Sequence, residues 1–342
     1  EGALQTLYVT TDGDAVYALS EPTPQALAKT FARYGTIVGH DLKPLIKLMP
    51  DPSTLIGHAL IDTRIAAWLA NPEQREYALQ RVYYEVAGLM LDEDQSSWPT
   101  AIWQLRPLLW DRLKSMDMLA VLTDIEMPLV PILAAMEQAG IKVDTAHIGA
   151  LLEMARTEVA KLEAHIYKLA GGEFNINSPA QMGEILFTKL GLKGRVRRTG
   201  GGALSTAASE LEKLRDEHPV VELILQYREL NKLKTTYIEP FPSLVAADGR
   251  LHTTYNQTGT ATGRLSSSDP NLQNIPTRTE LGQRFRTAFV APDGYRLLSL
   301  DYSQLELRIV AHIAHDETMI EAFRSGEDIH TRTACEVFKV AP

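Results

Sequence analysis

The stretch LLSLDYSQLELRIVAHI, residues 297–313, changes its hydrophobic pattern in the middle. It begins with a short apolar run at 297–300, which is typical of a buried strand. Beyond this run, apolar residues recur at every fourth position, which predicts an amphipathic helix: Leu305, Ile309 and Ile313. The pattern therefore places Asp301 where a strand ends and a helix begins, with Glu306 one turn into that helix.

A carboxylate in this place has two interpretations. Asp301 can be a ligand for a hard cation, because Mg²⁺ is bound by oxygen atoms that it usually shares with substrate phosphates. It can also be an ordinary N-cap, since Asp is favoured there, with Glu306 on the helix surface. The sequence upstream favours the cation ligand.

The upstream segment 258–278, TGTATGRLSSSDPNLQNIPTR, has few apolar residues and cannot build a core. Small hydroxyl and amide side chains and two arginines supply many hydrogen-bond donors on an irregular backbone. Such donors are typical of contacts to the phosphates, sugars and minor groove of a nucleic acid. The segment therefore predicts a nucleic-acid surface next to Asp301.

Two strings in these stretches, TATGRLSSSDPNLQNIP (260–276) and DYSQLELRIVAH (301–312), resemble the polymerase domain of the family A DNA polymerases of the bacterial polymerase I group. The second string is similar to motif A of that family. The resemblance implies a DNA-directed DNA polymerase that joins a dNTP to the 3′-hydroxyl of a primer–template. Its cofactor would be two Mg²⁺ ions, or Mn²⁺, that stabilise the attacking and leaving oxygens.

By this resemblance, Asp301 binds both metal ions and the backbone carbonyl of Tyr302 helps to hold the one that carries the nucleotide. Glu306 would exclude a ribose 2′-hydroxyl by steric clash. The implied dNTP site is completed by Ser303, Gln304, Leu305, His330 and Arg278. For the last two, a packed histidine and a surface arginine remain alternatives.

The resemblance also implies three groups of DNA contacts. The first group would contact the minor groove: Thr262, Arg264, Ser266, Asn271, Gln273 and Asn274. Acceptors at purine N3 and pyrimidine O2 occur there in every base pair, so hydrogen-bond donors can check the geometry of a pair without reading its sequence. A helix at the base of a thumb would grip the duplex with Arg228, Asn231, Lys232, Lys234 and Thr235. A basic, glycine-rich thumb tip would track phosphates with Lys193, Arg195, Arg197 and Arg198. For the helix and the tip, a solvated charged surface is the alternative.

The chain has 342 residues, a formal net charge of −9 and one cysteine, Cys335. The acidic balance does not indicate a polyanion partner by itself, although basic residues can gather on one surface. A single cysteine fits a reducing compartment, and no apolar run is long enough to span a bilayer. We therefore expect a cytoplasmic protein without a membrane partner.

The N-terminal residues predict a small α/β domain, because strands alternate with helices there: a hairpin at 4–20, a helix at 24–34, a strand at 36–39 and helices at 41–48 and 62–69. In the family this region is a ribonuclease H-like 3′–5′ exonuclease. The string VGHDLKPL (38–45) matches its second motif, but Leu45 stands where a metal-binding Asp belongs. Residues 100–112 lack the Tyr and Asp of the third motif, and the first would precede residue 1. We therefore expect a vestigial, inactive exonuclease domain in which Asp41 and Asp62 are structural.

Further along, a long helical pattern covers 112–140, with an apolar face made of Leu119, Leu122, Ile125, Leu129, Leu133 and Met136. Helices are also predicted at 144–169, 219–238 and 316–338, and strands at 251–257 and 284–290. The expected fold class is multidomain α/β and α+β. Its divisions are the exonuclease-like domain (1–115), a connecting helix (116–145), a thumb (146–240), the first part of a palm with motif A (241–314) and the start of the fingers (315–342).

The chain ends before the segments that resemble motifs B and C, which would supply triphosphate ligands and the second catalytic carboxylate. We therefore expect this chain alone to be inactive. Its partner would be the C-terminal portion of the same polymerase as a second polypeptide, unless the chain is an isolated fragment. A non-catalytic duplex-binding module and a 3′–5′ exonuclease are the rival functions.

Overall fold

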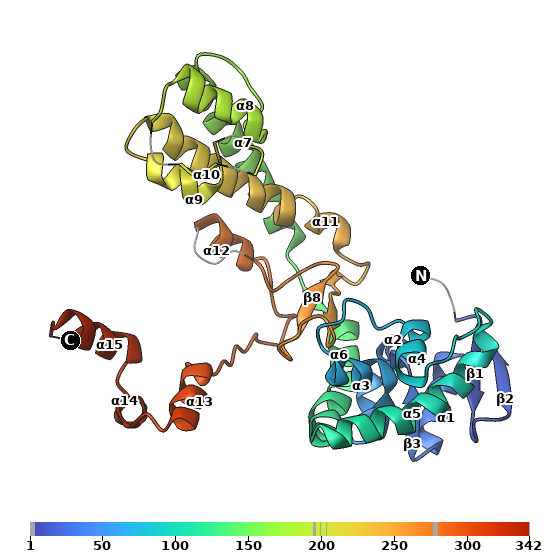
Figure 1. The fold of residues 1–342 in the computed structure, drawn as a ribbon. Coiled ribbons are helices and arrows are strands. Elements are labelled where there is room, and N and C mark those ends of the chain that lie inside the picture. The colour runs from blue at the N-terminus through green and yellow to red at the C-terminus, as the bar shows by residue number, and fades with distance from the viewer. Residues whose placement is uncertain (1–3, 194–195, 199, 203, 276–279, 342) are drawn as a thin grey trace. The chain divides into compact units, whose positions relative to one another are not determined.

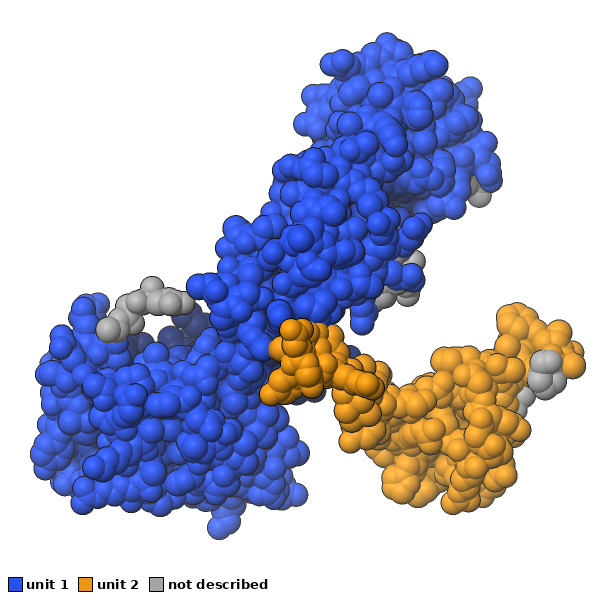
Figure 2. All heavy atoms as spheres, turned by 180° about the vertical axis from the view of Figure 1, so that it is seen from behind, with its two compact units in different colours: residues 1–290 blue, residues 291–342 orange. Residues whose placement is uncertain are grey.

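The computed structural model describes residues 4–193, 196–198, 200–202, 204–275 and 280–341. The chain forms two compact units, residues 1–290 and residues 291–342, which Figure 2 shows in different colours. The first unit contains the elements from β1 to α12, and the second contains α13, α14 and α15 (Figure 1). Within the described residues, no helix is both long and apolar enough to cross a membrane.

The N-terminal part of the first unit, which we call the α/β part (residues 4–139), alternates strands and helices as predicted. Its elements up to residue 115 are β1 (Thr6–Thr10), β2 (Val16–Ser20), α1 (Pro24–Arg33), β3 (Thr36–Gly39), α2 (Leu42–Lys47), η1 (Pro52–Leu55), β4 (Ala59–Asp62), α3 (Thr63–Ala70), α4 (Leu79–Ala87), η2 (Gln95–Ser97) and α5 (Trp98–Ser115). β1 and β2 form the predicted antiparallel hairpin. β3 and β4 run parallel, with Gly39 opposite Asp62, so the carboxyl ends of both strands meet at Asp62.

The helical pattern predicted for 112–140 is interrupted. After α5, the chain continues through the π-helical η3 (Val121–Glu126) into α6 (Met127–Ala139), which ends at Gly140. The predicted apolar face is wrong in part, because Ile125 is 53% and Met136 45% exposed, while Glu126 and Glu137 are buried. The π turn of η3 shifts the phase of the helix, and hydrogen-bonded carboxylates occupy buried positions that an apolar pattern does not reveal.

A second core lies in the helical part of the first unit. It is built by α7 (Thr145–Ala170), α8 (Pro179–Gly183), η4 (Glu184–Lys189), α9 (Ala208–Leu211), η5 (Glu212–Leu214) and α10 (Pro219–Leu233). Asp144 caps α7 and Gly171 ends it, as the sequence indicates, and Ser178 caps α8. α7 and α10 lie along each other and enclose buried residues such as Ile166 and Ile224 (Figure 1).

A third core joins the base of α7 to short strands. Its other elements are η6 (Lys234–Ile238), α11 (Phe241–Leu244), α12 (Glu280–Arg286) and the antiparallel pair β5 (Ile141–Lys142) with β6 (Arg250–Leu251). A second antiparallel pair, β7 (Thr254–Asn256) with β8 (Ser266–Ser268), follows β6 along the chain. The strand predicted at 284–290 is wrong over its first half, which belongs to α12. Leu281 and Phe285 are four residues apart and pack on the same core, as a helix allows. Phe289 then bridges Val143 in antiparallel fashion.

The second unit contains α13 (Leu305–Ala314), α14 (Glu317–Ser325) and α15 (Ile329–Phe338), which agree with the predicted helices. The buried strand predicted at 297–300 is wrong. These residues are not in a strand, and Leu298 and Leu300 are 82% and 84% exposed. A strand needs a neighbour to satisfy its backbone, and no strand of the described chain pairs with this run.

Candidate active site and nucleic-acid interface

Asp301 is the centre of the candidate active site, and the structure leaves its side chain exposed. It is not the N-cap of α13, because that position belongs to Gln304, whose backbone is left-handed with φ 54°. The neighbouring Tyr302 is also exposed. The described residues contain no group of three His, Cys, Asp or Glu side chains that would hold a metal ion together. At this position the chain therefore offers the Asp301 carboxylate and adjacent backbone carbonyls as oxygen ligands for a hard cation.

The other predicted dNTP-site residues of the second unit lie around the start of two helices. Glu306 is in the exposed first turn of α13, and His330 is exposed in the first turn of α15. The side-chain amide of Gln304 donates to Asp328 Oδ2 at 3.4 Å, a weak contact between these helix starts. Ser303 and Leu305 are exposed beside them.

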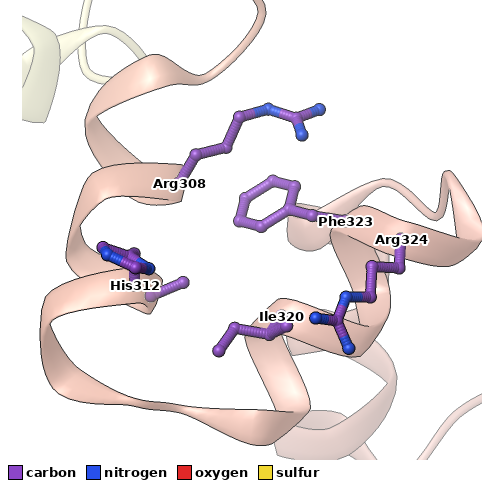
Figure 3. A pocket seen from close by; sticks show the side chains of 6 residues that line it. Arg308, His312, Ile320, Phe323 and Arg324 are labelled. Carbon is purple, nitrogen blue, oxygen red and sulfur yellow. The ribbon is translucent and has the colours of Figure 1, made fainter.

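Arg308 is a residue of this region that the sequence analysis missed. Its Nε donates to the backbone carbonyl of Ser303 at 2.9 Å, and its guanidinium lies 4.5 Å from the ring centre of Phe323. Figure 3 shows Arg308 and Phe323 on facing walls of a shallow pocket of 260 Å³, with His312, Ile320 and Arg324. Arg308 therefore connects the turn after Asp301 to α14. The sequence carried no signal for this contact, because its acceptor is a backbone carbonyl, which every residue has.

The polar segment upstream, residues 258–275, belongs to the first unit and is more ordered than its composition predicts. Its β8 pairs with β7, and the buried hydroxyl of Thr253 closes this hairpin by contacts with Ser267 Oγ at 2.7 Å and the Pro270 carbonyl at 2.8 Å. The predicted minor-groove residues are presented on its surface: Thr262, Arg264, Asn271, Gln273 and Asn274 are exposed, and Ser266 is half-buried. Gln273 Nε2 donates to the Leu265 carbonyl at 3.1 Å, which ties both sides of the segment together.

Three hydrogen-bonded anchors connect this hairpin to the α/β part. The indole N–H of Trp68 donates to the Thr260 carbonyl at 2.9 Å. The buried Gln257 amide donates to Glu126 Oε2 at 2.8 Å.

The third anchor is centred on the buried Glu137, whose Oε1 accepts the backbone N–H of Tyr255 at 2.9 Å. Lys43 contacts both Glu137 Oε1 and the Tyr255 carbonyl, and Lys47 Nζ lies 3.1 Å from Glu137 Oε2. A buried carboxylate needs such partners, and here they come from α2 and β7.

The basic residues of the helical part differ in their exposure. Lys232 and Thr235 are exposed on α10 and η6, and Asn231 and Lys234 are half-buried. Arg228 turns its guanidinium to the Thr206 carbonyl, and its partial burial lowers its pKa. Sequence reasoning placed Arg228 among the duplex-gripping residues and did not foresee this internal bond.

At the predicted thumb tip, Lys193, Arg197 and Arg198 are exposed. The backbone N–H groups of Lys193 and Arg197 donate to Glu217 Oε2 at 2.9 Å and Glu210 Oε2 at 2.8 Å. The tip is therefore held by two carboxylates, one from α9 and one from the turn before α10. Two further predicted residues, Arg195 in the tip and Arg278 near the triphosphate, lie outside the described residues.

The region that resembles an exonuclease centre has its carboxylates engaged in structure. Asp62 is 2% exposed; its oxygens accept the backbone N–H groups of Asp41 at 3.0 Å and Leu42 at 2.6 Å, and those of Arg64 at 2.9 Å and Ile65 at 3.4 Å. Burial raises the pKa of Asp62, and burial also lowers the pKa of the neighbouring His40.

Two further side chains complete this picture. The Asp41 carboxylate pairs with Arg64, and Leu45 packs against the first core. The carboxylates therefore bind backbone amides and an arginine.

Comparison with known proteins agrees with these observations. The sequence profile of DNA polymerase family A matches residues 145–342. The thermostable DNA polymerase I of Thermus aquaticus is 53% identical over 234 residues, which cover 68% of this chain and 28% of that protein. The thermostable DNA polymerase I of Thermus thermophilus is 43% identical over 322 residues, or 92% of this chain and 36% of that protein.

Among solved structures, the POL domain of Pol1 from M. smegmatis, in complex with DNA primer-template and dNTP, superposes with a TM-score of 0.86. It is 34% identical, and the match covers 98% of this chain and 61% of that one. The chain thus spans about a third of the length of the curated relatives it matches. Its sequence and its fold together show that the chain belongs to DNA polymerase family A.

Proposed function

We propose that this chain is the N-terminal portion of the large fragment of a DNA-directed DNA polymerase. The reaction is nucleotidyl transfer from a dNTP to the 3′-hydroxyl of a primer–template. The observation that carries the proposal is an exposed Asp301 within a string typical of motif A, in a chain whose residues 145–342 match the family. The M. smegmatis relative in complex with primer-template and dNTP supports the choice of substrates.

The Asp301 carboxylate and the Tyr302 carbonyl fit Mg²⁺, because both are hard oxygen donors on an exposed turn. When bound, two such ions supply charge stabilisation to the attacking and leaving oxygens. This chain's own residues position the nucleotide. Glu306 excludes a 2′-hydroxyl by occupying the space under the sugar, and His330 and Arg278 contact the triphosphate. Arg308 fixes the turn after Asp301 through its bond to the Ser303 carbonyl.

DNA is held by two surfaces of the first unit. The exposed donors of residues 262–274 contact minor-groove acceptors, and the cations of α10, η6 and the loop at 189–202 contact phosphates. In this assignment residues 1–115 form an exonuclease-like domain and residues 116–145 connect it to a thumb (146–240). A palm (241–314) follows, and the fingers begin at 315.

We also propose that the exonuclease-like domain is inactive. A proofreading centre needs several carboxylates directed at two metal ions. Here Asp62 is occupied by four backbone amides, Asp41 pairs with Arg64, and Leu45 is apolar.

The C-terminal portion of the same polymerase is the proposed partner. The second unit exposes many large apolar side chains: Leu297, Leu298, Leu300, Ile309, Val310, Ile313, Val337 and Phe338. Surfaces of this kind are usually interaction sites. The Thermus thermophilus relative is longer than this match, which covers 36% of it, and its remaining residues include the proposed partner segment.

The proposal is tested by mixing this chain with the C-terminal portion of its own polymerase and following primer extension with Mg²⁺. The chain alone should bind duplex DNA, more weakly at high salt, without extending the primer. The mixture should extend it, and Asp301→Asn should slow extension on the order of a thousandfold. Extension unchanged by Asp301→Asn would refute the role of Asp301, and binding without extension by any mixture would favour the duplex-binding module. Degradation of a labelled single strand by the chain with Mn²⁺ would refute the proposal that the exonuclease-like domain is inactive.

A further inference from the structure

Trp68 links the α/β part to the turn that carries Arg264. It lies on α3, is 2% exposed, and its indole N–H donates to the Thr260 carbonyl at 2.9 Å. Thr260 in turn donates its hydroxyl to the Arg264 carbonyl at 2.8 Å. A chain of two hydrogen bonds therefore runs from a core tryptophan to the backbone of a predicted minor-groove residue.

The turn between these bonds has little freedom to move. At Gly259 an added Cβ would lie 2.2 Å from Ser266 Oγ, so the two sides of the hairpin approach more closely than a side chain allows. Gly263, directly before Arg264, has φ +81°, which favours glycine. A shift of Thr260 is therefore transmitted to Arg264.

A buried indole N–H needs an acceptor wherever it lies, so the Trp68 bond alone is compatible with simple core satisfaction. The other two anchors indicate that the α/β part holds the hairpin in place. The α/β part also holds Gln257 through Glu126, and Tyr255 through Glu137. All three anchors fall on residues 255–260, which lead into the turn, and the Trp68 bond is the one nearest to Arg264.

We infer that Trp68 is a positioning residue for DNA binding: through Thr260 it sets the place of Arg264 against the minor groove. The inference rests on the proposed function. It gives the α/β part a task in DNA synthesis that is independent of exonuclease chemistry.

The test compares Trp68→Phe with Trp98→Phe in the complete chain. Both replacements remove one indole N–H that donates to a backbone carbonyl; Trp98 donates to Asp92 at 3.2 Å, within the α/β part. The affinity for a primer–template duplex is measured by fluorescence anisotropy, and stability by urea unfolding. Trp68→Phe should weaken duplex binding about three- to tenfold, the effect of one net hydrogen bond. Trp98→Phe should leave affinity unchanged.

A double-mutant cycle with Arg264→Ala separates positioning from general destabilisation. If Trp68 acts through Arg264, Trp68→Phe should weaken binding in the wild-type background and have little further effect when Arg264 is already Ala. Equal losses in both backgrounds, or a loss of stability with unchanged affinity, would refute the inference.

If Trp68→Phe fails to fold, Trp68 is replaced by 3-benzothienylalanine, which keeps the bicyclic ring and removes only the N–H. The same outcomes then apply. Failure of the proposed function would look different: the wild-type chain itself would not bind the duplex. A wild-type chain that binds, together with a Trp68 variant that binds equally well, overturns only the positioning role.

Discussion

Asp62 holds the amino end of α3 and the turn before α2 with one carboxylate. Asp62→Ala would leave four backbone N–H groups without their acceptor in a buried place. The free energy of unfolding should fall by about 3 kcal/mol, measured by urea denaturation. Asp12→Ala is the matched control, because Asp12 also accepts two backbone N–H groups but in an exposed turn, so its loss should be much smaller.

The same experiment checks the structural role of Asp62 against a metal-binding one. If Asp62 has only a structural role, adding Mg²⁺ or Mn²⁺ should shift the urea midpoint of the wild type no more than that of Asp62→Ala. A midpoint that rises with metal concentration in the wild type, but not in Asp62→Ala, would contradict this assignment.

Glu126 should make stability depend on pH. Burial raises its pKa, while its hydrogen bond from Gln257 acts in the opposite direction. A carboxyl whose pKa is higher in the folded state contributes stability that is fully present below its unfolded pKa and is lost as pH rises through the folded one. Glu126→Gln, which cannot ionise, should therefore be more stable relative to wild type at about pH 7 than at about pH 4.

Urea unfolding of both proteins between these two pH values measures this difference. A constant difference across the range would show that Glu126 titrates in the folded protein as it does in the unfolded one.

At the scale of elements, α12 depends on one aromatic contact set. Phe285 is fully buried, and its ring lies 4.9 Å from that of Phe241 and 5.9 Å from that of Phe289. Phe285→Ala should cost about 3–5 kcal/mol, because it removes a buried ring and leaves a cavity. Hydrogen exchange should rise first in α12. Phe338→Ala is the control, since that ring is 72% exposed and its removal should change stability little.

The sequence predicted elements well where local signals and packing agree. The Asp12-Gly13 turn, the Asp144 and Ser178 caps and the closing glycines Gly140 and Gly171 all mark real element ends. The sequence-based predictions failed where contacts with distant parts of the chain decide the secondary structure. The apolar run 297–300 requires a neighbouring strand, and the alternation at 284–290 also fits a helix that ends in a bridge.

The candidate site was accessible to sequence reasoning for a different reason. The motif strings mark Asp301 and the polar hairpin as candidates directly, because the proposed chemistry requires particular side chains. The anchors Trp68, Glu126 and Glu137 were missed, since each joins residues more than 100 positions apart in the chain. No periodicity within a window of the sequence contains such a pair.

At the scale of the whole chain, the two units should differ in local stability. The first unit contains three cores, whereas the buried hydrophobic residues of the second, among those described, are Ala311, Ala322 and Ile329. Amides of α13–α15 should therefore exchange with deuterium orders of magnitude faster than those of α7 and α10. Adding the C-terminal portion of the polymerase should slow exchange in the second unit. Equal protection of both units without any partner would contradict this expectation.

The bonding of Asp62 also bears on protein engineering. Proofreading could be installed in this chain by Leu45→Asp and similar replacements. The Asp62 carboxylate would then have to bind metal ions, and these ions would compete with the backbone N–H groups of Asp41, Leu42 and Arg64 that it now accepts. Each gain in nuclease chemistry would then loosen the α/β part. Trp68 lies on α3, so if it positions the DNA-contacting hairpin, a destabilised α3 would also weaken DNA binding. An editing variant would therefore require a new N-cap for α3 before any new carboxylate is introduced.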